Sequence, residues 1–129
     1  MLSAVIHSHK DLIVWQKAMD LVVGVYECTR DLPKEEVYGL VSQMRRSVVS
    51  IPSNIAEGRK RGTTRDYRQF LLIAYGSGAE LETQLEICKR LSFGKEGLRQ
   101  HVESLLNEVM RMLNKMIGNL SSSPNKLRT

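Results

Sequence analysis

Apolar residues recur along this chain at alternating steps of three and four, the spacing that places side chains on one face of an α-helix. Four such series follow one another, over residues 12–29, 37–58, 67–88 and 98–116. The expected inward-facing residues are Leu12, Trp15, Met19, Val22, Tyr26 and Thr29; Val37, Val41, Met44, Val48, Ile51, Ile55 and Gly58; Tyr67, Leu71, Ala74, Gly78, Leu81, Leu85 and Cys88; and Leu98, Val102, Leu105, Val109, Met112 and Met116. Short connections at 31–36, 60–64 and 92–97 make successive helices antiparallel. The sequence therefore predicts an all-α fold, an antiparallel up-and-down four-helix bundle.

Capping residues and breakers suggest where the bundle begins and ends. Asp11 is a candidate N-cap of the first helix, and Pro33 follows its end. Thr63 or Thr64 is placed to cap the third helix, with Asp66 in its first turn. We expect a flexible N-terminal arm over residues 1–10, one bundle domain over 11–120 and a disordered polar tail over 121–129.

Pro52 falls inside the second apolar series, where a helix normally excludes proline. The series continues in phase through Val48, Ile51 and Ile55, which a loop at this point would have no reason to preserve. The sequence predicts one helix with a proline kink, the alternative being two helices with a joint. Asn54 is expected to satisfy backbone groups near the kink or to fix helix register.

Apolar residues are more numerous than one bundle stripe requires. Six consecutive residues, Phe70–Tyr75, are apolar and would point in all directions around a helix. Unburied apolar positions typically mark an interface, so we expect self-association. The alternative is that these positions pack against loops or the N-terminal arm of the same chain.

No arrangement of residues points to an enzyme. The inward-facing Glu-x-x-His pairs of a carboxylate-bridged metal site are missing from the sequence, as are a phosphate-binding glycine loop and a nucleophile signature. Glu57 with Glu80 or Glu82 could form an acid–base pair, but pairing with arginine or solvent is the simpler reading. His7 and His9 are read as arm residues. We expect no catalytic residue, no metal and no cofactor.

The remaining compositional features favour a soluble intracellular protein. Cys28 and Cys88 have neither metal-ligand nor redox spacing and are expected to be reduced thiols in the cytoplasm. The chain shows no signal-peptide pattern and no apolar run of the ~18 residues that a membrane span needs. Gly76 and Gly78 lower helix propensity within the third helix, which is tolerable where two helices approach closely.

The formal net charge of +5 is concentrated in one segment. Between residues 45 and 68 there are seven basic and two acidic residues, and this difference equals the net charge of the whole chain. The basic residues are Arg45, Arg46, Arg59, Lys60, Arg61, Arg65 and Arg68. A concentrated basic patch rich in arginine suits contacts with phosphates, so these seven are the candidate nucleic-acid-binding residues.

Two readings of this patch stay open. Arg59, Lys60 and Arg61 could merely complement the C-terminal dipole of the second helix, with the other basic residues solubilising the surface or pairing at an interface. In the functional reading the patch binds the nucleic-acid backbone with a steep dependence on salt. No aromatic platform for stacking bases is evident in the sequence, so readout of bases is not expected.

Four segments carry a specific resemblance to a known family. They are VWQKA at 14–18, YGLVSQMRRS at 38–47, SIPSNIAEG at 50–58 and FLLIAYGSGAELETQL at 70–85. As a set they resemble the bacterial four-helix-bundle proteins encoded in intervening sequences of 23S ribosomal RNA genes, over about residues 9–120. Arg45 and Arg46 match the family's paired arginines, and Pro52, Asn54, Glu57 and Gly58 belong to its structural signature.

The resemblance implies a homopentameric bundle with no established enzymatic activity. A more distant similarity connects the chain to the accessory variability proteins of diversity-generating retroelements, which are basic pentamers that bind a reverse transcriptase and nucleic acid. The resulting expectation is a cytoplasmic, non-enzymatic, homo-oligomeric protein that binds nucleic acid, above all RNA, as an accessory of an RNA-handling or reverse-transcriptase complex. A structural or protein-binding scaffold without nucleic-acid contact is the alternative.

Overall fold

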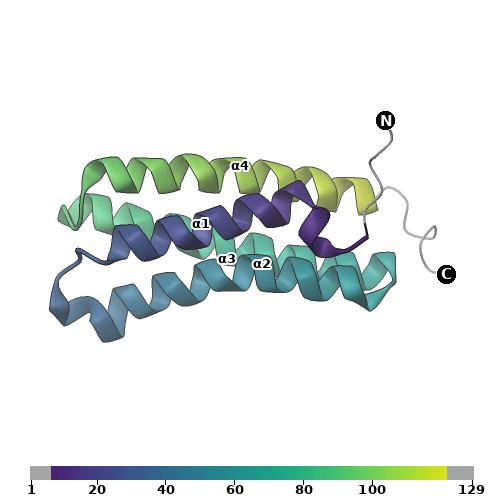
Figure 1. Cartoon of the computed structure of the whole chain (residues 1–129), viewed down its shortest axis with the longest axis horizontal. Helices are drawn as coiled ribbons and strands as arrows, with labels where there is room; N and C mark the ends of the chain where they lie inside the picture. Colours follow the sequence, from purple (N-terminus) through teal and green to yellow (C-terminus); the bar gives the residue numbers. More distant parts are fainter. Residues whose placement is uncertain (1–6, 122–129) are drawn as a thin grey trace.

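The structure, a computed structural model, describes residues 7–121 and consists of four long helices (Figure 1). They are α1 (Ile13–Thr29), α2 (Ser42–Arg61), α3 (Thr64–Leu91) and α4 (Glu96–Ser121), and no strand occurs in this range. Successive helices run in opposite directions (Figure 1). The predicted all-α four-helix bundle is therefore confirmed.

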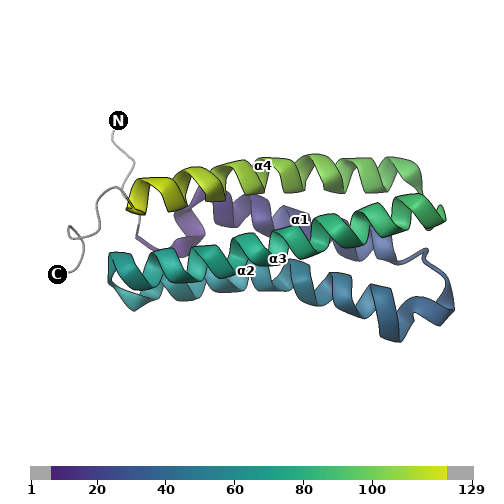
Figure 2. The same cartoon turned by 180° about the vertical axis from the view of Figure 1, so that it is seen from behind.

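The helices close into a four-membered bundle in which each one packs against two others. α1 contacts α2 and α4, and α3 also contacts α2 and α4; Figure 2 shows α3 lying between the latter two from behind. The α2–α3 turn is very short because Gly62 adopts a left-handed conformation with φ of 88°. This turn lies at the same end of the bundle as the start of α1 and the end of α4 (Figure 1).

The buried faces of α2 and α3 are those that the apolar series predict. In the second predicted series every position from Val41 to Gly58 is buried, and only Val37 is exposed. In α3 the six positions from Leu71 to Cys88 are buried, and Tyr67 is half-buried. In α3 the register holds although Phe70–Tyr75 are all apolar, and Leu72 and Ile73 of that run are exposed.

The predicted register of α1 is wrong by one position. The residues that reach the core are Val14, Ala18, Leu21, Val25 and Cys28, whereas Met19 and Tyr26 are exposed. Of the predicted series only Thr29 is buried, and Leu12, Trp15 and Val22 are half-buried. Paired apolar residues such as Leu21 and Val22 offer two series one step apart, and spacing alone does not choose between them. The small side chains of Ala18 and Gly24 decide, because a Cβ at Gly24 would lie 3.2 Å from Val102 Cγ2 on α4.

The same ambiguity affects α4. Val102 and Val109 are buried as predicted, but Leu106, Leu113 and Ile117 fill the core. The predicted neighbours Leu98, Leu105, Met112 and Met116 are only half-buried.

Short helical turns precede α1 and α2. A 3₁₀ helix, η1 (His9–Asp11), is capped by Ser8, whose side chain accepts a hydrogen bond from the Lys10 backbone N–H at 3.1 Å. We expected Asp11 to be the N-cap of α1, but the N-cap residue is Leu12. The Asp11 carboxylate instead accepts the His7 and Ser8 backbone N–H groups at 2.8 and 3.2 Å, which lowers its pKa. Helical structure therefore begins within the segment expected to be an arm, whereas residues 1–6 and 122–129 lie outside the described range.

The loop after α1 contains a 3₁₀ turn, η2 (Lys34–Glu36), and a π-helical turn, η3 (Val37–Val41), which leads directly into α2. Glu36 accepts a hydrogen bond from the Leu40 backbone N–H at 3.4 Å and so caps η3. Turns of the π type are frequent at functional sites.

α2 runs without interruption through Pro52, so the reading of a single helix is correct; the kink at Pro52 stays a prediction. Asn54 Nδ2 donates to the Ser50 carbonyl oxygen at 2.8 Å and to Ser50 Oγ at 2.9 Å. Ser50 Oγ in turn lies 2.8 Å from Ser77 Oγ on α3. Asn54 therefore satisfies a backbone carbonyl as expected, and the Ser50–Ser77 hydrogen bond joins α2 to α3.

Glycines mark the closest approaches between helices. A Cβ at Gly58 would lie 2.6 Å from Phe70 Cβ, so α2 and α3 can meet here only without a side chain. A Cβ at Gly78 would clash with Met110 Sδ on α4, as expected for a close helix contact. Gly76 differs from that expectation, because a Cβ there would meet nothing within 4 Å.

Candidate nucleic-acid interface

The seven predicted basic residues separate into two groups at opposite ends of α2. Arg45 and Arg46 lie in its first turns, whereas the other five lie in its last turn and the first turns of α3. The helix rises ~1.5 Å per residue, so the groups are about 20 Å apart. The basic segment of the sequence therefore forms two separate basic surfaces in the folded protein.

At the α2–α3 turn, three basic side chains project into solvent. Arg59, Lys60 and Arg65 are exposed, and none of them forms an ion pair with a described residue. They are called the basic end below. Because no described carboxylate neutralises them, their charge is available to an external anion.

The other two basic residues near this turn already have partners within the chain. Arg61 forms an ion pair with Glu57 at 2.9 Å, and its guanidinium lies 4.9 Å from the centre of the Phe70 ring. This pair confirms that Glu57 contacts an arginine. Arg68 is half-buried and donates from Nε to the carbonyl oxygen of Ile117 at 3.3 Å, so it joins α3 to the last turns of α4.

Arg45 is likewise held within the protein. Its Nε donates to Thr29 Oγ1 at 3.0 Å, its Nη2 donates to the Tyr26 carbonyl at 3.4 Å, and its guanidinium lies 4.4 Å from the centre of the Tyr26 ring. These contacts tie α2 to the end of α1. Arg46, one position on, is exposed and has no ion pair with a described residue.

A groove of about 530 Å³ opens beside these arginines, between the end of α1, η3 and the start of α2. We call it the tyrosine groove; it is lined by Tyr26, Val37, Tyr38, Val41, Ser42, Arg45, Arg46 and Val49. Tyr38 is 96% exposed and protrudes from η3. The apolar spacing placed Tyr26 in the core, and no site role was predicted for Tyr38, although Tyr38 lies only seven positions before Arg45.

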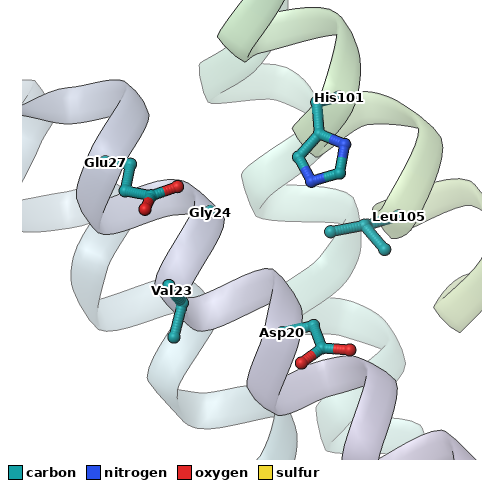
Figure 3. A pocket seen from close by; sticks show the side chains of 6 residues that line it. All are labelled: Asp20, Val23, Gly24, Glu27, His101 and Leu105. Carbon is teal, nitrogen blue, oxygen red and sulfur yellow. The ribbon is translucent and has the colours of Figure 1, made fainter.

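Two other grooves carry negative charge. The first, lined by Asp20, Val23, Gly24, Glu27, His101 and Leu105, has a volume of about 310 Å³ (Figure 3). Its carboxylates come from α1, and its imidazole projects from α4 toward α1 (Figure 3). The second, between α3 and α4, is lined by Glu82, Leu85, Glu86, Glu103, Leu106 and Asn107. Carboxylates in both disfavour a polyanion.

In the described part of the chain no three His, Cys, Asp or Glu side chains gather in a way that could hold a metal ion. The acidic groove of Figure 3 is no exception, although two carboxylates and one histidine are among its lining residues.

The two cysteines lie in the core as free thiols. Burial raises the pKa of Cys28 to about 11 and also raises the pKa of Cys88. Both thiols therefore stay protonated and unreactive near neutral pH. Arg99 of α4, which the apolar pattern did not single out, is almost fully buried and lies 3.4 Å from Glu103 through Nε. Its long-range charge lowers the pKa of both thiols, but by less than burial raises it.

Fold and charge distribution together define an all-helical bundle with one basic end and a second cationic groove. The chain belongs to the 23S rRNA-intervening sequence protein family, whose model matches residues 10–115. This match confirms the resemblance carried by the four sequence segments. The more distant similarity to retroelement accessory proteins stays a prediction.

A solved structure supports the fold. The chain is similar to a protein of unknown function from the S23 ribosomal protein family of Bacteroides thetaiotaomicron, with 23% sequence identity and a TM-score of 0.75. The alignment covers 82% of this chain and 96% of that one. No curated protein matches the chain. Within residues 7–121, no helix has both the length and the apolar character needed to cross a membrane.

Proposed function

We propose that this protein is a non-enzymatic, cytoplasmic helix bundle that assembles with copies of itself and binds nucleic acid, above all RNA. The observation that carries the proposal is the basic end, where Arg59, Lys60 and Arg65 are exposed without a described ion-pair partner. Membership of a family named for 23S rRNA intervening sequences favours RNA as the ligand.

The chemistry of the basic end suits phosphates more than base edges. Arginine presents a planar fork of donors that matches phosphate oxygens, and lysine adds a mobile point charge. The basic end lies at the C-terminus of α2, where the helix dipole favours cations, so part of its charge also stabilises the helix. Binding there would depend steeply on salt, because each phosphate contact releases a condensed counterion.

Exposed apolar side chains support the self-association part of the proposal. Ile13 and Val23 project from α1, and Leu72, Ile73 and Leu91 project from α3. Such surface is costly to leave in water and is typical of interfaces. We propose the homopentamer that the family resemblance implies. Light scattering coupled to size exclusion should give about five times the chain mass of 14.7 kDa, and a monomer would refute this part.

The proposed cellular role is accessory. The protein would hold RNA for an RNA-handling or reverse-transcribing complex. The alternative function is a scaffold that contacts only proteins, which the same exposed apolar side chains favour.

RNA binding separates the two functions. Fluorescence anisotropy with a labelled RNA at low salt should show binding to the wild-type protein and weaker binding to the variant Arg59→Gln, Lys60→Gln, Arg65→Gln. A matched control replaces Lys34, Lys89 and Arg111, three exposed basic residues outside the 45–68 segment, and changes the net charge equally. The proposal requires the control to bind RNA more tightly than the basic-end variant. No binding by the wild type at low salt would leave the scaffold.

A further inference from the structure

The tyrosine groove has a composition that phosphate binding alone does not explain. A site for the sugar–phosphate backbone needs cations, yet this groove also has three valines and two tyrosines among its lining residues. Tyr38 is the most exposed large apolar side chain described, and its ring is accessible on the surface. The groove therefore combines positive charge with flat apolar surface.

We propose that the tyrosine groove binds unpaired nucleotides of a single-stranded nucleic acid, with Tyr38 as the ring on which a base stacks. Aromatic rings beside arginines are the usual means by which proteins hold single strands without reading their sequence, because every base has a π-face. The inference rests on the proposed function and extends it, since it adds a second contact and a preference for unpaired over paired RNA.

The charges around the groove select a polyanion. No carboxylate lines the tyrosine groove, whereas each of the other two grooves is lined by at least two. Glu36, the nearest acidic residue before Tyr38, turns its carboxylate to the Leu40 backbone N–H and caps η3. Arg46 is exposed at the rim and is available to a phosphate.

The groove is also prearranged. Arg45 is fixed by its bonds to Thr29 Oγ1 and the Tyr26 carbonyl, and it covers the Tyr26 ring at 4.4 Å. One wall of the groove is thus held in place before a ligand arrives, and little side-chain entropy is lost on binding. Tyr38 stands on η3, one turn before α2, so its backbone is also part of a hydrogen-bonded element.

The two cationic surfaces are spaced for one strand. Arg46 and Lys60 are fourteen positions apart in α2, or about 20 Å at ~1.5 Å per residue. A stacked single strand advances ~3.4 Å per nucleotide, so roughly six nucleotides connect the groove to the basic end. A strand of about twelve nucleotides would reach both surfaces.

Two labelled RNAs test the inference: a single strand of about twelve uridines and a duplex of the same length. Wild-type protein should bind the single strand more tightly at equal salt. Tyr38→Ala should weaken that binding roughly 5- to 100-fold, the loss typical of removing one stacking ring, with duplex affinity unchanged. Tyr38→Phe keeps the ring and should bind as the wild type does. Ile87→Ala, an exposed apolar residue of α3 outside the groove, is the matched control.

A stacking-specific readout completes the test. A single strand carrying 2-aminopurine should lose fluorescence on binding to the wild-type protein and to Tyr38→Phe, but not to Tyr38→Ala. Unchanged single-strand affinity in Tyr38→Ala overturns the inference, as does an equal loss for single strand and duplex. If Tyr38→Ala instead lowers the assembly mass without changing RNA affinity, the groove is an interface between copies. Failure of the wild type to bind either RNA refutes the proposed function itself.

Discussion

The contact between α2 and α3 at Gly58 gives the sharpest prediction about stability. In Gly58→Ala the new Cβ would lie 2.6 Å from Phe70 Cβ and 3.3 Å from the Tyr67 carbonyl oxygen. Carbon atoms prefer separations of ~3.5–4.0 Å, so the helices must part by about 1 Å. Both atoms are on or next to the backbone, so neither can move away by a rotamer change.

The expected magnitude is the difference of two terms. Overpacking a closely packed contact costs about 1–3 kcal/mol, and the rigid neighbours place Gly58→Ala at the upper end. Replacing a helical glycine by alanine returns about 1 kcal/mol of helix propensity. The net loss in the free energy of unfolding is therefore about 2 kcal/mol.

Urea denaturation followed by circular dichroism measures this loss, with all variants at one protein concentration because assembly adds to stability. Gly97→Ala in α4 is the matched control, since a Cβ there meets nothing within 4 Å. The control should be as stable as the wild type or up to about 1 kcal/mol more stable. A Gly58→Ala protein as stable as the control would refute the close approach of α2 and α3.

Three further predictions concern the cap of α3, the buried thiol and the polar contact between α2 and α3. Thr63 Oγ1 accepts the Asp66 backbone N–H at 3.1 Å, so Thr63→Ala should lose about 1 kcal/mol in urea denaturation, and Thr63→Ser should restore it. Burial raises the pKa of Cys28 from 9.0 to about 11; the folded chain thus keeps a proton that the unfolded chain releases, and the free energy of unfolding should fall between pH 9 and 11, by up to ~1.4 kcal/mol per pH unit. Cys28→Ala should flatten that fall, and an unchanged slope would contradict the assignment. Ser77→Ala breaks the hydrogen bond between Ser50 and Ser77 and should cost about 1 kcal/mol, a loss that should shrink when Asn54 is already alanine if the three side chains act as one network.

The sequence predicts fold and charge better than it predicts contacts. Register is correct in α2 and α3 and wrong in α1, where Leu21 and Val22 belong to two apolar series one step apart. The choice between them depends on how closely α4 approaches Gly24. This is a feature of tertiary packing, which the spacing of apolar residues along one helix does not encode.

The candidate site shows the same limit. The seven candidate basic residues lie in one segment of the sequence. Only the folded structure shows that Arg45 and Arg68 donate hydrogen bonds to Thr29 and Ile117. The tyrosine groove brings together Tyr26 and Tyr38 across the α1–α2 loop. Neither tyrosine is near a recognisable motif for base stacking, so the aromatic surface that the sequence did not predict emerges only from the arrangement of η3 beside α1.

The salt dependence of RNA affinity tests the central claim most directly. For a single strand, log K should fall linearly with log salt concentration, with a slope of about −0.7 for each phosphate contact. Replacing Arg59, Lys60 and Arg65 with glutamine should make this slope shallower by up to about 2, whereas replacing Lys34, Lys89 and Arg111 should leave it unchanged. Equal slopes for the two triple variants would contradict the assignment of RNA binding to the basic end.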